Sequence, residues 1–295
     1  MAKKVFEAFM NVTKIIDLKN NGVLIKSDEQ HLYAGCDGTI YKYQLGEMSL
    51  ISSIALFNAK KTNKYSTVYF SIFDEFIFVC EFCNLHIVQK ETMQLLFSVR
   101  LGENSSSDIL GVIDFIYPNA YVNIRNGKIA IFNVNTQEIK WIVVDESSCW
   151  SSSVTSDRIY YSTTYGALLE LERNTLRELR RIQLTKKMNI YGVECYDDAL
   201  YTVSEKGFKI VDVKTFEINQ EEPNVFSSTE ARMPGIINDT IVVAEWRKIA
   251  LFHTHTLLLL DRFSFPTGYH YMREALLSGN NLYGSDEHGI YRCTI

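Results

Sequence analysis

The amino-acid sequence predicts an all-β protein, a seven-bladed β-propeller built from four-stranded antiparallel blades. Three observations lead to this prediction. A hairpin-like unit recurs seven times along the 295 residues. Each copy contains two apolar runs, and the first apolar residue of the second run recurs at spacings of 39 to 45 residues. Each copy leaves room for about four strands, which is typical of a propeller blade.

The repeat is clearest in residues 28–43, where an apolar run, a Cys-Asp-Gly turn and a second apolar run follow one another. This pattern predicts a β-hairpin. In most copies an Asp or Asn precedes the first run, as is typical of tight turns, because these side chains hydrogen-bond to the nearby backbone. Six further copies occupy residues 74–88, 119–132, 157–171, 197–211, 238–252 and 280–292.

We predict that residues 1–295 form one domain. The repeats divide this domain into blades. Runs such as Ile77–Cys80 are apolar on both faces, as expected for strands covered by neighbouring blades on both sides. The last copy ends after its third strand, so the run at 3–10 is expected to supply the fourth strand and close the ring. The approximate blades are 22–56, 67–101, 109–144, 150–184, 190–219, 231–265, and 273–295 plus 3–10.

The segment Arg173–Leu184 carries two conflicting patterns. Its apolar residues have helical spacing and its composition favours a helix. Its place in the repeat instead predicts a turn followed by an outer strand, and this is the prediction we adopt.

Composition excludes several classes of protein. With 46% hydrophobic and 22% charged residues, the chain has the composition of an ordered globular protein. A net charge of −5 without long single-sign runs argues against binding to nucleic acid. Glu7 interrupts the only candidate for a signal peptide, and no run is long enough to span a membrane, so a soluble, cytoplasmic protein is expected. Its six cysteines are then expected to be free thiols, mostly in the core.

The strand–turn–strand segment Ile131–Trp141 resembles the repeat of pyrroloquinoline-quinone-type propellers, in which a Thr-containing turn is followed by Lys and Trp. Weaker copies lie at 88–97, 171–179 and 211–218. The chain as a whole resembles the WD40-like and quinoprotein-like propellers, which implies the architecture alone. It lacks the Gly-His and Trp-Asp pairs of WD40 repeats. It also lacks the vicinal cysteines of quinone-dependent dehydrogenases, so no cofactor is expected.

Linear motifs for catalysis or metal binding are weak. No P-loop, Gly-x-Ser-x-Gly or His-Glu-x-x-His sequence occurs. The pair Cys80 and Cys83 forms a CxxC, and His253 and His255 are two residues apart, but neither pair has an evident second pair of ligands. We therefore predict no metal, and interpret these residues as core thiols and a solvated turn.

The turns between the second and third strands should gather on one face of the ring, together with the loops that join the blades. Aromatic residues and Arg dominate binding hot spots, and several occur in these segments. We therefore predict a monomeric, non-enzymatic scaffold that binds a protein or peptide on this face. The candidate binding residues are Trp246, Arg247, Trp150, Tyr165, Arg125, Tyr269, Tyr271 and Arg273.

The alternative is a propeller enzyme, a hydrolase or lyase acting on a carbohydrate or another small molecule. Carboxyl and imidazole groups from different blades could share general acid and base roles at the channel mouth. The candidates are Glu81, Glu205, Asp286, His288 and His270. Because propellers host both binding proteins and enzymes, the fold does not choose between the two functions.

Overall fold

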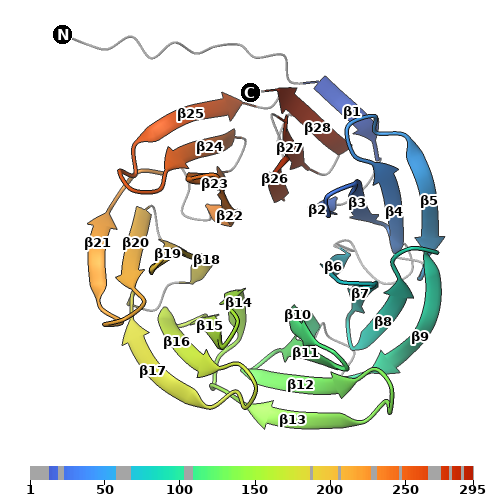
Figure 1. Ribbon diagram of the computed structural model, residues 1–295, viewed down its shortest axis with the longest axis horizontal. Coiled ribbons are helices and arrows are strands. Elements are labelled where there is room, and N and C mark those ends of the chain that lie inside the picture. Colours follow the sequence, from blue (N-terminus) through green and yellow to red (C-terminus); the bar gives the residue numbers. More distant parts are fainter. Residues whose placement is uncertain are drawn as a thin grey trace.

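The computed structural model is a ring of seven four-stranded antiparallel sheets around a central channel (Figure 1). It describes residues 13–18, 23–57, 68–102, 109–186, 189–204, 207–226, 231–245, 248–264, 274–278, 281–286 and 289–294. The predicted seven-bladed propeller is confirmed. We number the strands of a blade from first to fourth, from the channel outward.

The first four blades follow one another along the chain. Blade 1 contains β2 (Leu24–Ser27), β3 (His31–Cys36), β4 (Thr39–Gln44) and β5 (Leu50–Ala55). Blade 2 contains β6 (Tyr69–Phe73), β7 (Phe76–Glu81), β8 (Asn84–Gln89) and β9 (Gln94–Arg100). Blade 3 contains β10 (Ile109–Ile116), β11 (Asn119–Ile124), β12 (Lys128–Asn133) and β13 (Ile139–Val143). Blade 4 contains β14 (Cys149–Val154), β15 (Arg158–Thr163), β16 (Ala167–Glu172) and β17 (Glu178–Gln183).

The remaining three blades complete the ring. Blade 5 contains β18 (Ile190–Tyr196), β19 (Ala199–Ser204), β20 (Gly207–Asp212) and β21 (Ile218–Glu222). Blade 6 contains β22 (Arg232–Ile237), β23 (Thr240–Ala244), β24 (Lys248–His253) and β25 (Leu259–Ser264). Blade 7 contains β26 (Glu274–Ser278), β27 (Asn281–Ser285), β28 (Gly289–Thr294) and, as its fourth strand, β1 (Thr13–Asp17).

The segment with the conflicting helical pattern is a strand. Residues Glu178–Gln183 form β17, which pairs with β16. The tertiary pairing outweighs the local helical preference, because Leu176, Ile182 and Leu184 of this segment pack in the apolar clusters that blade 4 shares with its neighbours. No helix long and apolar enough to cross a membrane occurs in the described part of the chain.

The core lies between the blades rather than inside any one of them. Second strands are almost wholly buried, as in β7, whereas fourth strands such as β9 alternate between exposed and half-buried residues. Among the described residues, seven clusters of buried apolar side chains each join two neighbouring blades. Each blade is therefore stabilised mainly by the apolar surface that it buries against its neighbours.

Turn chemistry explains the hairpins. Asp37-Gly38 is a two-residue turn with positive φ at both positions, as such tight hairpins require. Asn126-Gly127, the last two residues of the three-residue turn 125–127, also have positive φ. A Cβ on Gly127 would lie 2.1 Å from the carbonyl oxygen of Asp145, in the loop leading to the next blade. The turns between second and third strands therefore lie against the loops that join blades. The sequence predicts that these turns and the blade-joining loops share one face of the ring, which we name the hairpin-tip face.

The closing strand is not the one predicted. The fourth strand of blade 7 is β1, Thr13–Asp17, whereas the run at 3–10 lies outside the described residues. Ile16 and Asp17 of β1 pair with Ile290 and Gly289 of β28. The N-terminal part of the chain thus closes the ring as expected, but with a later segment.

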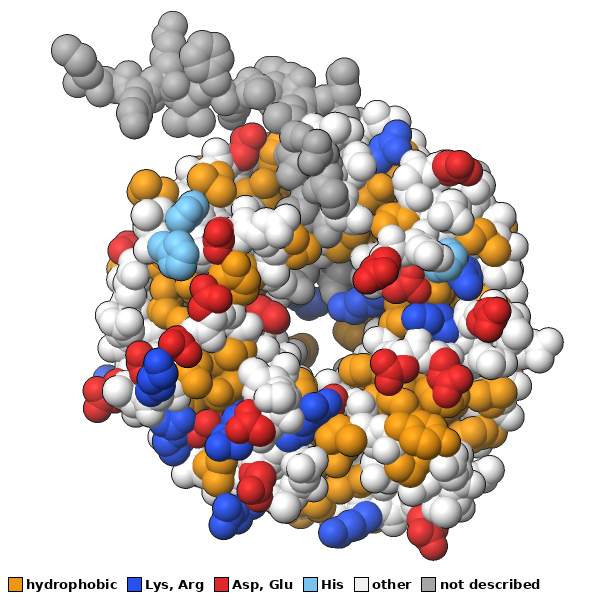
Figure 2. All heavy atoms as spheres, viewed as in Figure 1, with side chains coloured by type: hydrophobic (Ala, Val, Ile, Leu, Met, Phe, Trp, Pro, Cys, Tyr) orange, Lys and Arg blue, Asp and Glu red, His pale blue; other side chains and the backbone are white. Residues whose placement is uncertain are grey.

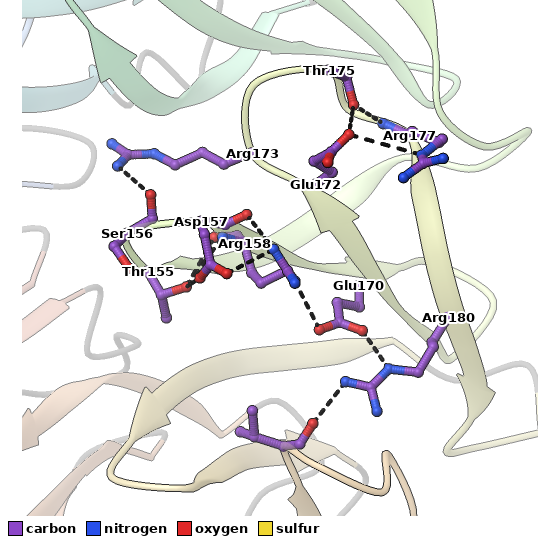
Figure 3. A network of polar contacts seen from close by, with 11 residues as sticks. Thr155, Ser156, Asp157, Arg158, Glu170, Glu172, Arg173, Thr175, Arg177 and Arg180 are labelled. Carbon is purple, nitrogen blue, oxygen red and sulfur yellow. Dashed lines mark hydrogen bonds and ion pairs between the residues drawn. The ribbon is translucent and has the colours of Figure 1, made fainter.

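Charged side chains join blade 4 to both of its neighbours, through an ion pair to blade 3 and hydrogen bonds to blade 5. Asp114 of blade 3 is buried and receives two hydrogen bonds from Arg173, at 2.6 and 2.9 Å. Arg158 and Arg180 approach the buried carboxylate of Glu170 from opposite sides (Figure 3). Arg180 also donates 2.7 Å hydrogen bonds to two backbone carbonyls of blade 5, those of Val213 and Lys214.

Candidate functional site

The central channel widens into a cavity of about 320 Å³. Figure 2 shows the opening at the centre of the ring. The cavity walls come mainly from the first strands of blades 1 to 6, with Asn123 and Ala244 from second strands, and most lining residues are apolar or small. The charged and aromatic side chains among them are Lys26, Tyr69, Phe70, Trp150, Tyr191, Glu194 and Arg232.

Trp150 is the predicted binding residue that lies at this cavity. It is the second residue of β14, which starts at the hairpin-tip face, and its side chain is 50% exposed. The Tyr191 ring of blade 5 lies 6.2 Å from the Trp150 ring, centroid to centroid, and is inclined to it at 57°. Asn189 Nδ2 donates a 3.1 Å hydrogen bond to the Tyr191 hydroxyl. The two rings form an accessible aromatic pair at the channel mouth.

Hydrogen bonds hold the two strands that carry this pair. Ser151 Oγ accepts from the Val193 N–H at 3.0 Å, and Ser153 Oγ accepts from the Cys195 N–H at 2.9 Å. Both bonds run from the first strand of blade 4 to the first strand of blade 5. The aromatic pair therefore stands on a fixed frame rather than on mobile loops, which reduces the entropy lost on binding.

The other predicted binding residues are less central or lie outside the described part of the chain. Arg125 and Tyr165 are exposed residues in the hairpin turns of blades 3 and 4, and neither lines the cavity. They lie on the same face as Trp150 but farther from the channel axis. Trp246, Arg247, Tyr269, Tyr271 and Arg273 lie outside the described residues.

Glu194 is the cavity residue that sequence reasoning missed. It lies in the middle of β18, and burial alone raises the pKa of its carboxyl to about 7. Lys26 and Arg232 line the same cavity. A signal was available, because Glu194 is the one charged residue in the otherwise uncharged strand Ile190–Tyr196. The sequence assigns its candidate residues to hairpin turns and blade-joining loops, whereas the channel wall is formed mainly by first strands.

The stability of Glu194→Gln should differ from that of the wild type in a pH-dependent way. The pKa of Glu194 is about 7 in the folded protein, above the ordinary value of 4.5. Between these values the folded protein binds a proton that the unfolded chain does not, so wild-type stability falls as pH rises and levels off above about pH 7. Glutamine cannot ionise, so the advantage of the variant should grow by on the order of 1–3 kcal/mol between about pH 5 and about pH 8. Urea unfolding at the two pH values measures the difference, and parallel profiles would refute the burial of a titrating carboxyl.

The predicted catalytic set is not assembled by the residues that are described. Glu81 lies 3.0 Å from His86 Nε2 within its own blade, and Asp286 accepts a 3.1 Å hydrogen bond from the Gly289 N–H within its hairpin. Neither residue lines the channel cavity. Glu205, His270 and His288 lie outside the described residues.

The sulfur and imidazole pairs occupy separate environments. Cys80 and Cys83 are both buried, and burial raises the pKa of the Cys80 thiol to about 12, so this thiol is protonated at neutral pH. The rings of His253 and His255 are 5.6 Å apart at the turn between β24 and β25. In the part of the chain that the structure describes, no three His, Cys, Asp or Glu side chains are placed to hold a metal ion together.

Comparisons with known proteins support the architecture. No family model matches the chain, and no curated protein matches it by sequence. Among solved structures it is similar to the crystal structure of the computationally designed Ika8 protein, with a TM-score of 0.71 and 11% sequence identity. The match covers 96% of this chain and 98% of the designed one. A likeness at this identity shows the fold alone, so the resemblance to WD40-like and quinone-type repeats stays a prediction.

Proposed function

We propose that the protein is a non-enzymatic scaffold that binds a protein or peptide on its hairpin-tip face, with the channel mouth at the centre of the contact. The observation that carries this proposal is the aromatic pair of Trp150 and Tyr191 at the channel cavity. Half of the Trp150 side chain is exposed, although its strand is held in place by hydrogen bonds. A rigid, accessible Trp next to a cavity is typical of a binding hot spot.

The charges of the cavity favour a polypeptide segment over a polyanion. Arg232 and Lys26 are basic, whereas Glu194 is an acid within the same walls. A segment with an apolar tip and polar flanks could cover the two rings and use charged groups of both signs. The exposed Tyr165 in the neighbouring hairpin turn extends the same face outward from the channel.

Affinity capture from a native lysate, followed by mass spectrometry, tests this proposal when it is run with matched variants. We expect Trp150→Ala combined with Tyr191→Ala to lose a stoichiometric partner that the wild type retains. The expected loss is at least about 2 kcal/mol of binding free energy, as for hot-spot residues. Trp141→Ala is the control, because Trp141 is 47% exposed but lies on β13, at the outer rim.

The outcomes distinguish an interface at the channel mouth from one at the outer rim. Loss of the partner in the double variant with retention in the Trp141 variant supports the channel mouth. Loss in the Trp141 variant alone would move the interface to the outer rim and contradict the proposal. A thermal melt of each variant verifies that folding is unchanged.

An enzyme remains the second candidate because of Glu194. A carboxyl whose pKa lies near 7 can both accept and donate a proton at neutral pH. If the channel holds a small-molecule substrate of the carbohydrate kind, Glu194→Gln should abolish turnover while leaving partner capture intact. The scaffold proposal expects no turnover in the wild type or in the variant, and retained partner capture in both.

A further inference from the structure

A second cavity, of about 450 Å³, lies between blades 1 and 2 on the face opposite the hairpin tips. Its walls are the turns that follow β2, β6 and β8, together with side chains of β3 and β4. This volume is within the range of about 300–1,000 Å³ that is usual for small-molecule sites. The lining residues are Asp28, Glu29, Gln30, His31, Tyr33, Lys42, Asp74, Glu75, Gln89, Lys90 and Glu91.

A buried lysine forms part of the wall of this cavity. Lys42 is only 6% exposed, and its ammonium lies 5.9 Å from the centre of the Tyr33 ring. Lys42 Nζ donates a 3.2 Å hydrogen bond to the backbone carbonyl of Lys90, and within the described residues it has no carboxylate partner. An ammonium group has three donors, and a buried charge without a counter-charge is costly.

The equivalent place between blades 4 and 5 shows how this charge could be neutralised. Lys42 pairs with Tyr33 and Ser52 on its two flanking strands, just as Glu170 pairs with Tyr160 and Arg180. Between blades 4 and 5, Arg180 supplies the charge opposite to that of Glu170. Arg180 also donates a hydrogen bond to the carbonyl of Val213, which follows the third strand of blade 5. Between blades 1 and 2, Lys42 reaches the corresponding carbonyl, and Ser52 supplies no counter-charge.

The rest of the cavity is mainly acidic, with Lys90 as its second lysine. Burial opposes ionisation of Asp28, but hydrogen bonds from the backbone of Gln30 and His31 and from Tyr33, together with the charge of Lys90, lower its pKa to about 2. Asp28 is thus a fixed anion, and it lies 3.4 Å from Lys90 Nζ. The exposed rim adds four acids, which are Glu29, Asp74, Glu75 and Glu91.

We propose that this cavity binds a small molecule with a carboxylate at one end and an ammonium or guanidinium several atoms away, as in a basic amino acid. The carboxylate would occupy the place of the missing counter-charge at Lys42, while the cation would lie among the acids of the rim. The acidic rim disfavours a simple anion, and the buried ammonium disfavours a simple cation. A ligand that carries both charges satisfies both ends.

Isothermal titration calorimetry with three related compounds tests the proposal on the wild-type protein. L-Arginine has both charges, agmatine lacks the carboxylate, and L-citrulline lacks the guanidinium charge. We expect L-arginine to bind in the millimolar range or tighter, and each of the other two to bind more weakly. Equal binding of agmatine, equal binding of citrulline, or no binding of L-arginine would each overturn the proposal.

A variant identifies the residue responsible. Lys42→Met keeps the length and removes the charge, so affinity for L-arginine should fall by about tenfold to a hundredfold, as expected for loss of a charge-assisted hydrogen bond. Its melting temperature should be equal to or above that of the wild type, because an unpaired buried charge is removed. Lys209→Met is the control, since Lys209 Nζ also donates to a backbone carbonyl, that of Leu184, but does not line this cavity. Unchanged arginine affinity in the Lys42 variant would contradict the assignment.

Discussion

Glu170→Ala is expected to destabilise the protein by about 2–4 kcal/mol, because it leaves two arginines without their shared counter-charge. The Glu170 side chain is 5% exposed and pairs with both Arg158 and Arg180. The arginines are about one-third exposed and can partly regain water, which keeps the loss below that of a fully buried pair. Arg180 also joins blade 4 to blade 5, so its reorientation weakens that interface. Urea unfolding measures the change.

Glu172→Ala provides the matched control for this prediction. Glu172 is in the same strand, but its side chain is 37% exposed and lies 3.8 Å from that of Arg177. Exposed pairs of this kind contribute about 0–1 kcal/mol. If both substitutions cost the same, the buried network of blade 4 would not contribute to stability as described.

Removal of residues 1–17 is expected to lower the melting temperature by on the order of 10 °C. This truncation deletes β1, exposes the edge of β28 and uncovers the apolar cluster between blades 7 and 1, against which Ile15 and Ile16 pack. A chain that begins at Thr13 retains β1, so the difference between the two chains measures the contribution of the closing strand. Equal melting temperatures would contradict closure of the ring by β1.

A point substitution tests the same closure without shortening the chain. A Cβ on Gly289 would lie 2.0 Å from the carbonyl oxygen of Ile16, so Gly289→Ala should force β1 away from β28. Gly235→Ala is the control, because nothing lies within 4 Å of the corresponding Cβ position. We expect a clear loss of stability in the first variant and little change in the second.

Local signals made the fold predictable from the sequence. The hairpins depend on neighbouring residues such as Asp37 and Gly38, whose positive φ values give a tight turn. The identity of the closing strand depends on a pairing between the two ends of the chain, which leaves no local signal. Both 3–10 and 13–17 contain apolar residues, and the close fit of Gly289 against Ile16 is visible only in the folded ring.

The candidate site was predictable only where it depends on local sequence signals. Trp150 could be identified because it is one of three tryptophans and precedes a repeat. The raised pKa of Glu194 could not be predicted, because it results from burial by strands that are distant in the sequence. The missing partner of Lys42 likewise requires the register that places Ser52 beside it.

The most direct test of the binding face is photo-crosslinking to the captured partner from single positions. A photoreactive phenylalanine analogue would replace Trp150, Tyr165 or Trp141 in turn. The first two positions lie on the hairpin-tip face and the third lies on the outer rim. We predict crosslinks from positions 150 and 165 and none from position 141. Crosslinks from position 141 alone would contradict a partner at the channel mouth.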